Sequence, residues 1–316
     1  MNMNEYIADL TNLLTETKGV AASTAAVYIK MLITLNDKKV FKNLAFLKNK
    51  QYIVNKINTY AESTQKTFYA AIVSCLSFNR DKSAYKSTYN FFYEKMMGKA
   101  KEMKESATGD RTEKQKTNWI EWKDVTEKKE ELLKEISTFV NNKTLTSSQY
   151  EKLLQLLVLS LYVCIQPRRN QDYLDMFVVK SHDDKMPTIS NYLDLDKNKF
   201  IFNKYKTAKK YGVQIVSIPD DLRKVIDLYL KHNALFKGVK GKIPVPFLVN
   251  FKGETIVAVN AITRILNKIF NKKLGSSMLR HIFLSDKYGD IKEDMAEDAK
   301  AMGHSVDEQQ NTYVVK

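Results

Sequence analysis

The sequence predicts a mainly α-helical protein of two domains, with a small antiparallel β-sheet in the second domain, which is therefore of the α+β class. At 316 residues the chain is long enough for about two domains, since one domain usually takes roughly 100–200 residues. Apolar residues recur at spacings of three and four over most of the chain, the pattern of amphipathic helices, and become strand-like only between residues 186 and 218. Glycine (10) and proline (5) are scarce, which disfavours a β-sandwich.

Residues 1–105 form the first predicted domain, which we expect to be helical. One helix is expected to begin at a cap provided by Ser23 or Thr24, a second begins near residue 63, and a third covers residues 85–97. Each helix is too short to be stable alone. Their apolar stripes are therefore expected to pack together as a core.

Residues 106–122 are predicted to be a linker, because most of this segment is polar and highly charged without apolar periodicity. Residues 123–316 then form the second domain. An early helix of this domain is expected to start after Thr146, Ser147 or Ser148. Its apolar residues cover nearly all sides, which is typical of a central buried helix.

The strand-like part of the second domain predicts an antiparallel hairpin. Residues 200–202 and 213–218 are rich in Val, Ile and Phe, and they flank a lysine-rich turn that contains Gly212. This hairpin is the centre of the predicted sheet.

Four helices are expected after the hairpin. The first starts with Pro219 in the favoured first helical position. The others are expected over residues 258–271, 277–288 and 291–302. Gly303 is expected to end the last of them.

The charge of the chain favours an anionic partner. Lys plus Arg is 51 and Asp plus Glu is 36, giving a net charge of +15, and in a chain of this kind nucleic acid is the leading candidate. One basic segment contains no acid between its first and last lysine, and its one-sided charge suits a phosphate backbone. Its members are Lys38, Lys39, Lys42, Lys48, Lys50 and Lys56.

Several classes of protein are disfavoured. The N-terminus lacks the pattern of a signal peptide, and the longest apolar stretch, residues 153–165, is too short for a membrane helix. We therefore expect an intracellular protein that is not secreted and has no membrane partner. Two cysteines, Cys75 and Cys164, provide no disulfide scaffold or zinc motif. With four histidines in the chain, no metal and no cofactor are predicted.

Side chains suited to phosphate chemistry occur at four places in the second domain. Arginines can hold the nonbridging oxygens of a phosphodiester, a lysine or histidine can protonate a leaving oxygen, and a tyrosine can be a covalent nucleophile. Taken singly, each of these residues could equally be an ordinary surface or structural residue. The four groups are Arg168 and Arg169; Lys204, Lys206, Lys209 and Lys210; Arg280 and His281; and His304 with Tyr313.

The order of these groups resembles that of the tyrosine recombinases of the phage-integrase type. In QPRRNQDYLDM, Arg169 and Asp172 have the spacing of the first arginine box, which makes Arg169 the expected catalytic arginine and Arg168 the runner-up. In FNKYKTAKKYGVQIVSIPDDL, Lys206 is the best match to the hairpin lysine. Lys204 and Lys209 lie close enough to remain alternatives.

Two further boxes complete the resemblance. SSMLRHIFLS is similar to the segment with the second arginine, which is Arg280 here, but Ser277 stands where the family has a histidine. MGHSVDEQQNTY is similar to the final motif, with His304 nine residues before Tyr313. The chain ends three residues after Tyr313, so a C-terminal segment that docks on a neighbouring subunit is expected to be short or absent.

The resemblance implies a site-specific recombinase or integrase, of a virus or mobile element, that cleaves DNA through a 3′-phosphotyrosyl intermediate without metal or ATP. Tyr313 would be the nucleophile, Arg169 and Arg280 would hold the phosphate, Lys206 would protonate the leaving oxygen and His304 would bond the phosphate. His281 and Asp172 would support the site. Because a hydroxyl is no base near neutral pH, Ser277 is expected to keep at most a hydrogen-bonding role.

The resemblance also implies a partner and an assembly. Residues 1–105 would be a helical core-binding domain that clamps double-stranded DNA together with the catalytic domain, with the lysines at 38–50, Lys204 and Lys209 along its phosphates. The protein would be a monomer or weak oligomer without DNA and a tetramer on two DNA sites. Its location would be that of its target, the host cytoplasm or nucleus. Two alternatives stay open: a type IB topoisomerase-like relaxing enzyme, and a DNA-binding protein of the same fold that has lost catalysis.

Overall fold

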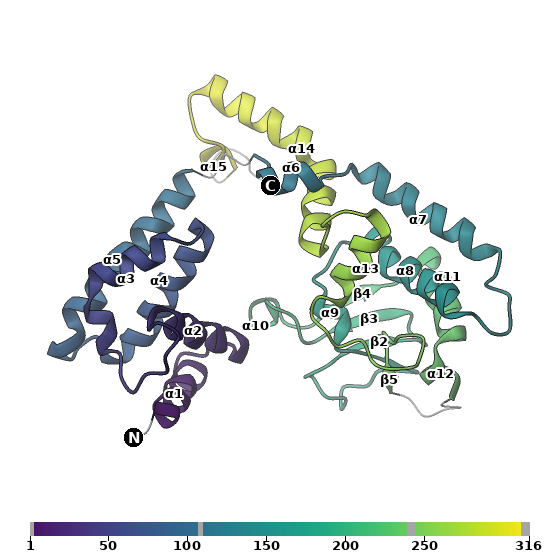
Figure 1. Ribbon diagram of the computed structural model, residues 1–316. Helices are drawn as coiled ribbons and strands as arrows, with labels where there is room; N and C mark the ends of the chain where they lie inside the picture. The colour runs from purple at the N-terminus through teal and green to yellow at the C-terminus, as the bar shows by residue number, and fades with distance from the viewer. Residues whose placement is uncertain (1–2, 107–109, 239–243, 311–316) are drawn as a thin grey trace. The chain divides into compact units, whose positions relative to one another are not determined.

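The computed structural model describes residues 3–106, 110–238 and 244–310 (Figure 1). The chain divides into two compact units, Met1–Asp110 and Arg111–Lys316. The boundary lies inside the segment 106–122 that the sequence predicts to be a linker. The two units are called the N-terminal unit and the C-terminal unit, and each is described by itself.

In its described part, the regular secondary structure of the N-terminal unit is all helical. Its core contains residues from all five long helices, with Leu10 from α1, and examples with no exposed surface are Leu32, Ile53, Ile72 and Phe92. The apolar stripes of the sequence therefore do form a core. The helices are α1 (Met3–Asn12), α2 (Ala22–Leu35), α3 (Lys50–Asn58), α4 (Glu62–Leu76) and α5 (Ser83–Glu105).

The predicted cap of α2 is wrong. The N-cap residue is Ala21, which makes no side-chain cap bond, and Ser23 and Thr24 lie inside the first turn. α5 is also longer than the predicted residues 85–97. It continues to Glu105 through polar turns that have no apolar periodicity and that the sequence therefore did not indicate.

The predicted linker is partly ordered structure of the C-terminal unit. Thr112 and Gln115 form a capping box at the start of α6 (Glu113–Asn118). The Asn118 Oδ1 accepts a hydrogen bond from the Lys273 backbone N–H at 2.9 Å, and the Trp119 carbonyl accepts one from Lys272 Nζ at 2.9 Å. These contacts attach the segment after residue 111 to the body of this unit.

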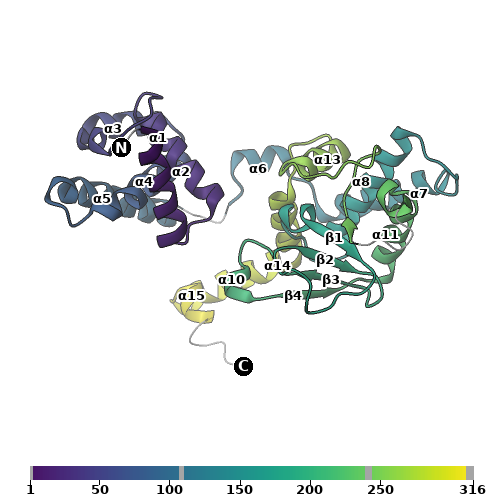
Figure 2. The same cartoon turned by 90° about the horizontal axis from the view of Figure 1, so that it is seen from below.

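The central helix of the C-terminal unit is α8 (Ser147–Val163). It starts where the sequence predicts, with Thr146 as N-cap and a capping box to Gln149. Eleven of its residues are buried. It contacts α7 (Trp122–Ser137), α11 (Asp220–His232) and α13 (Ala261–Phe270), and Figures 1 and 2 show α7, α8 and α11 together on one side of the sheet.

The sheet has five strands in the order β4-β3-β2-β1-β5. The predicted hairpin is confirmed, since β3 and β4 pair antiparallel with Phe200 opposite Val216. The expectation of a wholly antiparallel sheet is wrong, because β1 and β2 are parallel. The connection between them returns the chain to the end of the sheet at which β1 began, so β2 runs in the same direction as β1. The strands are β1 (Met176–Val179), β2 (Asn191–Asp194), β3 (Lys199–Phe202), β4 (Gln214–Ser217) and β5 (Val245–Pro246).

The largest departure from the predicted helices is α14 (Ser276–Met302), which is one continuous helix of 27 residues. The predicted break between residues 288 and 291 is absent, and Gly289 lies inside the helix. Gly303 ends α14 with φ 76°, as expected, and α15 (Val306–Glu308) follows. Pro219 is the N-cap of α11 and not its first residue, and α12 (Ala234–Gly238) follows α11.

None of the helices in the described part of the chain is both long enough and apolar enough to cross a lipid bilayer. In the same residues, no group of three or more His, Cys, Asp and Glu side chains is arranged to hold a metal ion.

Candidate functional site

The first arginine box lies in a turn between α8 and the short helix α9 (Gln171–Leu174). The Tyr162 hydroxyl on α8 donates a hydrogen bond to Asn170 Oδ1 at 2.8 Å. The Asn170 amide donates in turn to Thr263 Oγ1 on α13 at 2.9 Å. The turn is therefore held between two helices that lie about 100 residues apart in the sequence.

Arg168 is bound inside the protein. Its Nε donates to Asp172 Oδ2 at 2.9 Å, its Nη1 donates to Gln214 Oε1 at 2.8 Å, and its guanidinium lies 3.8 Å from the centre of the Phe202 ring. A planar guanidinium with three such contacts fixes the turn against β3 and β4. This favours Arg168 as a structural residue and leaves Arg169 as the arginine for a ligand.

Arg169 and Arg280 lie close enough to influence each other. Burial, followed by the like charge of Arg169, lowers the pKa of the Arg280 guanidinium. Within the described residues, the Arg169 side chain has no hydrogen bond, and Arg280 has one, at 3.4 Å, to the Ser276 carbonyl. Two half-buried cations with most of their donors unused would be stabilised by an anion that accepts from both.

Asp172 is the carboxylate beside these arginines, and it is 2% exposed. Burial raises the pKa of Asp172, while the charges of Arg168, Arg169 and Arg280 oppose the rise. Its Oδ2 bonds to Arg168, and its Oδ1 is buried without a hydrogen-bond partner among the described residues. Asp172, which the sequence predicts to support the site, thus forms an ion pair with Arg168.

The lysine-bearing turn of the hairpin, residues 203–213, lies against the arginine turn. The ring of Tyr205 is 5.2 Å from Arg168 Cζ, and its hydroxyl donates to the Gly212 carbonyl at 2.7 Å, which closes the turn around α10 (Ala208–Tyr211). Lys206, the next residue, is exposed. The sequence-predicted hairpin lysine is thus one residue from a side chain that touches the arginine box.

The three candidate hairpin lysines differ in their partners. Lys204 Nζ pairs with Asp175 Oδ2 at 2.9 Å. Lys206 and Lys209 are exposed and have no ion pair within the described residues. Because Lys204 already forms an ion pair within the protein, Lys206 is favoured over Lys204 as the lysine that contacts a ligand.

His304 is not brought to the arginines. It follows the C-terminal end of α14, while Arg280 lies in the second turn of that helix, 24 residues earlier (304 − 280). The helix ends at Met302, 22 residues after Arg280 (302 − 280), so at a rise of about 1.5 Å per residue its C-terminal end lies about 33 Å from Arg280 along the axis. Figures 1 and 2 both show α15 at the far end of α14 from α13.

The remaining candidates of the second arginine box are at the surface. Ser277 and His281 are both exposed, and the buried serine of this turn is Ser276. Nothing in the described contacts of His281 indicates a supporting role at the arginines. Tyr313 lies outside the described residues.

The lysine segment of the N-terminal unit is less uniform than the sequence predicts. Lys56 pairs with Asp37, which immediately precedes the segment, at 2.6 Å. Lys50 Nζ donates to Ser87 Oγ at 2.8 Å, and Lys48 lies over the Tyr85 ring at 5.1 Å. The exposed lysines of the turn after α2 are Lys38, Lys39 and Lys42.

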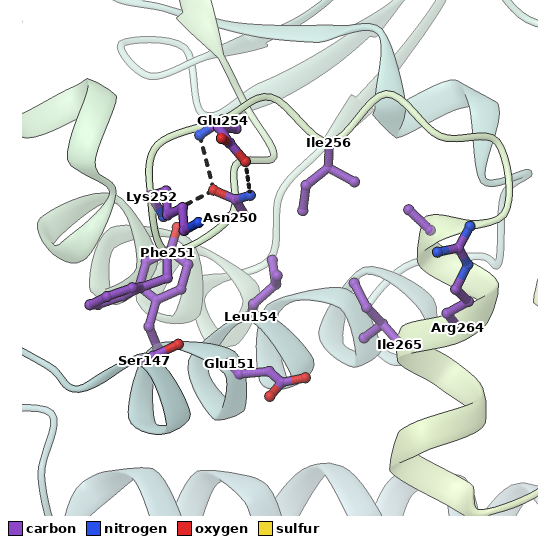
Figure 3. Close-up of a pocket in the computed structure, with 12 residues that line it drawn as sticks. Ser147, Glu151, Leu154, Asn250, Phe251, Lys252, Glu254, Ile256, Arg264 and Ile265 are labelled. Atoms are coloured by element: carbon purple, nitrogen blue, oxygen red, sulfur yellow. Dashed lines mark hydrogen bonds between the residues drawn. The ribbon is translucent and has the colours of Figure 1, made fainter.

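A separate cavity of about 460 Å³ lies at the other end of α8 (Figure 3). Tyr150, Leu154 and Ile265 are among the residues that line it, and Asn250 folds the facing loop by bonding Glu254 and Lys252. Ser147 at this end and Val163 at the arginine end are about 24 Å apart, because 16 residues rise about 1.5 Å each. The cavity is therefore distinct from the arginine site.

Sequence reasoning missed the polar residues that build the site. Asn170, Gln214 and Asn191 each join segments that are distant in the chain. Asn191 gave one usable signal, because asparagine is depleted in strands yet stands here at the start of an otherwise apolar strand. The other two resemble ordinary loop and strand residues in the sequence.

Searches against models of known families, curated proteins and solved structures found no match to this chain.

Proposed function

We propose that the protein is a site-specific DNA recombinase that cleaves and rejoins DNA strands through a phosphotyrosyl intermediate. The observation that carries the proposal is that Arg169 and Arg280, which are 111 residues apart in the chain (280 − 169), lie near enough for the charge of one to lower the pKa of the other, while most of their donors are unused. Like charges brought together in a half-buried site favour an anion that bridges them. The proposed proton donor is Lys206, which follows Tyr205, whose ring lies 5.2 Å from Arg168 Cζ.

The proposed chemistry is a transfer of a phosphoryl group from DNA to Tyr313. The tyrosine oxygen attacks the phosphorus, its proton is released to water, and the bond from phosphorus to the 5′ oxygen breaks. Lys206 gives a proton to that oxygen, which leaves as a 5′-hydroxyl. In the second step a 5′-hydroxyl from another strand attacks the phosphotyrosine, and the tyrosine regains its proton, so one phosphodiester replaces another without an added energy source.

The arginines supply the electrostatic part of this reaction. Bidentate contacts from Arg169 and Arg280 would offset charge that develops on the nonbridging oxygens. The pKa of an ordinary tyrosine is near 10, so a phenolate near neutral pH needs strong positive charge nearby. Double-stranded DNA is the proposed substrate, the net charge of +15 supports its binding, and integration or excision of a viral or mobile element is the proposed setting.

A second candidate is a DNA-binding protein of the same architecture that does not cleave. The observation that favours it is the length of α14, whose C-terminal end, just before His304, lies about 33 Å along its axis from Arg280. A histidine at that distance cannot contact a phosphate held by the arginines. The two candidates therefore differ in whether α14 bends: a recombinase in which His304 contacts the phosphate needs a bent α14, whereas a protein that only binds DNA does not.

The test requires DNA that the protein recognises. Duplexes are selected from a random pool by binding to the full chain, and the selected sequence is then made with a nick near its centre, so that cleavage releases a short piece and traps the adduct. The recombinase proposal predicts a covalent protein–DNA adduct that resists denaturation by detergent. Selection of a specific duplex without any adduct would support the second candidate and overturn the first.

Two variants test whether Tyr313 is the residue that forms the adduct. Tyr313→Phe should abolish it, whereas Tyr288→Phe, at an exposed tyrosine on α14, should not. An adduct that survives Tyr313→Phe would refute the assigned nucleophile. Relaxation of a supercoiled plasmid lacking the selected sequence, at a rate equal to that of cleavage, would indicate a topoisomerase instead.

A further inference from the structure

Asn191 is a buried amide at the meeting point of the arginine turn and the lysine turn. It is the first residue of β2 and has no exposed surface. Its Nδ2 donates to the Asp172 carbonyl at 2.8 Å and to the Lys204 carbonyl at 2.9 Å, and its Oδ1 accepts from the Lys204 N–H at 2.8 Å. An amide can make four hydrogen bonds at most, so three of its four positions are used at this junction.

The two segments that Asn191 joins bear the candidate phosphate-contacting residues. The Asp172 carbonyl is three residues after Arg169, in α9, which directly follows the turn of the first arginine box. Lys204 is two residues before Lys206, and both of its backbone polar groups are held by the one amide. Asn191 therefore fixes the start of the lysine turn relative to the arginine turn.

The lysine turn depends on Asn191 more than the arginine turn does. The arginine turn has other bonds, through Arg168 to Asp172 and Gln214 and through Asn170 to Thr263. Besides the Asn191 amide, the described side-chain links from the lysine turn to that region include the ion pair of Lys204 with Asp175, whose lysine side chain is 56% exposed, and the contact of the Tyr205 ring with Arg168 at 5.2 Å. An exposed pair of this kind contributes little, so loss of the Asn191 amide should displace the lysine turn first.

The geometry points to Asn191 as a positioning residue that sets the place of Lys206 against a phosphate held by Arg169 and Arg280. This inference rests on the proposed strand-transfer function. Asn191 touches no substrate in this role and acts through the backbone of Lys204. Misplacing a proton donor by about 1 Å costs on the order of 100-fold in rate, so the expected effect on cleavage is large.

The test separates proton transfer from binding. Cleavage of the selected nicked duplex is compared with cleavage of the same duplex carrying sulfur in place of the 5′ bridging oxygen at the scissile phosphate. A thiolate leaves without a proton because a thiol is far more acidic than an alcohol (the pKa of a free thiol is about 8.5). Asn191→Ala should slow cleavage of ordinary DNA by about 10–100-fold, slow cleavage of the sulfur-substituted DNA by less than about threefold, and leave binding unchanged.

Two variants calibrate the result. Lys206→Ala should show the same selective rescue by sulfur. Asn233→Ala is the matched control, because Asn233 is also a fully buried amide with three bonds, to the backbone of Leu235, Phe236 and Phe247, and contacts neither turn. It should slow both substrates equally or not at all.

The outcomes distinguish the inference from the proposed function. No adduct with the native chain would refute the function itself. A native adduct, together with an Asn191→Ala variant that slows both substrates alike or behaves as Asn233→Ala does, would refute the positioning role alone. If Asn191→Ala does not fold, Asn191→Asp is measured instead, since it keeps the acceptor for the Lys204 N–H and loses the two donors.

Discussion

Replacing Arg168 by methionine should destabilise the C-terminal unit, whereas the same change at Arg169 should not. The Arg168 and Asp172 side chains are 15% and 4% exposed, so their ion pair is shielded from water. Removing one member of a buried pair costs about 3–5 kcal/mol, because the other charge is left uncompensated. Asp172 is especially sensitive, since its Oδ1 already has no partner within the described structure.

The expected shift in melting temperature follows from the size of the unit. The C-terminal unit has 206 residues (316 − 111 + 1), and for units of this size 1 kcal/mol corresponds to about 2–4 °C. Arg168→Met should therefore lower Tm by roughly 6–20 °C. Arg169→Met breaks no hydrogen bond among the described residues and relieves repulsion with Arg280, so its effect on stability should stay within about 0.5 kcal/mol.

Tryptophan fluorescence measures this unit alone, because the chain has two tryptophans, Trp119 and Trp122, and both belong to it. The loss caused by Arg168→Met should shrink as the pH falls. Burial raises the pKa of Asp172, and removal of Arg168 raises it further, so the cost of the unpaired carboxylate disappears once it is protonated. A shift below about 2 °C for Arg168→Met, or a larger shift for Arg169→Met, would show that the two assignments are reversed.

Three further predictions concern other parts of the chain. Gly289→Ala should stabilise α14 by about 0.5–1 kcal/mol, since a Cβ there meets no atom within 4 Å. If cleavage requires a bend at this residue, adduct formation by the variant should slow by about two- to fivefold while DNA binding stays unchanged. An unchanged rate of adduct formation would exclude such a bend. The Cys164 thiol, whose pKa burial and the Asp221 hydrogen bond raise to about 12, should react with a disulfide reagent at pH 8 roughly 50–100-fold more slowly than free cysteine. Mass spectrometry of the labelled peptide measures that rate, and Asp221→Asn should increase it. Changing the lysines at positions 38, 39 and 42 to glutamine should reduce the slope of log affinity for DNA against log salt by up to about 3, whereas an unchanged slope in binding titrations would place the DNA elsewhere.

The elements predicted best from the sequence were those specified by short-range patterns. Thr146 with Gln149 marks the start of α8 locally, and the β3–β4 hairpin follows from two short strand-like runs around Gly212. The parallel pairing of β1 and β2 was missed because it depends on a crossover and leaves no local signal. The break expected near Gly289 was wrong because one glycine costs a helix only about 1 kcal/mol.

The sequence predicted Arg169 and Arg280 as residues of one site, but it did not predict the contacts around them. The spacing of the arginine box selected Arg169 over Arg168, and the structure favours that choice for a reason the sequence did not contain. Besides the nearby Asp172, the partners of Arg168 include Gln214 and Phe202, which lie dozens of residues further along the chain. Asn191 was missed for the same reason, because its role consists of bonds to two distant backbones.

The two candidate functions differ by the free energy needed to bend α14, and this energy is small enough for DNA binding to supply. Leu284, Tyr288 and Ile291 are 51%, 47% and 54% exposed, and their spacing of four and three places them on one face of the helix. If the bent form buried the exposed surface of these three side chains, each would stabilise that form by about 1 kcal/mol, or by about 3 kcal/mol together. Interrupting the helix at Gly289 loses a few backbone hydrogen bonds, each with a net worth of about 1 kcal/mol, so the straight and bent forms would differ by only a few kcal/mol. A DNA phosphate that His304 contacts only in the bent form would then decide the conformation, and the rate measured for Gly289→Ala reports on that balance directly.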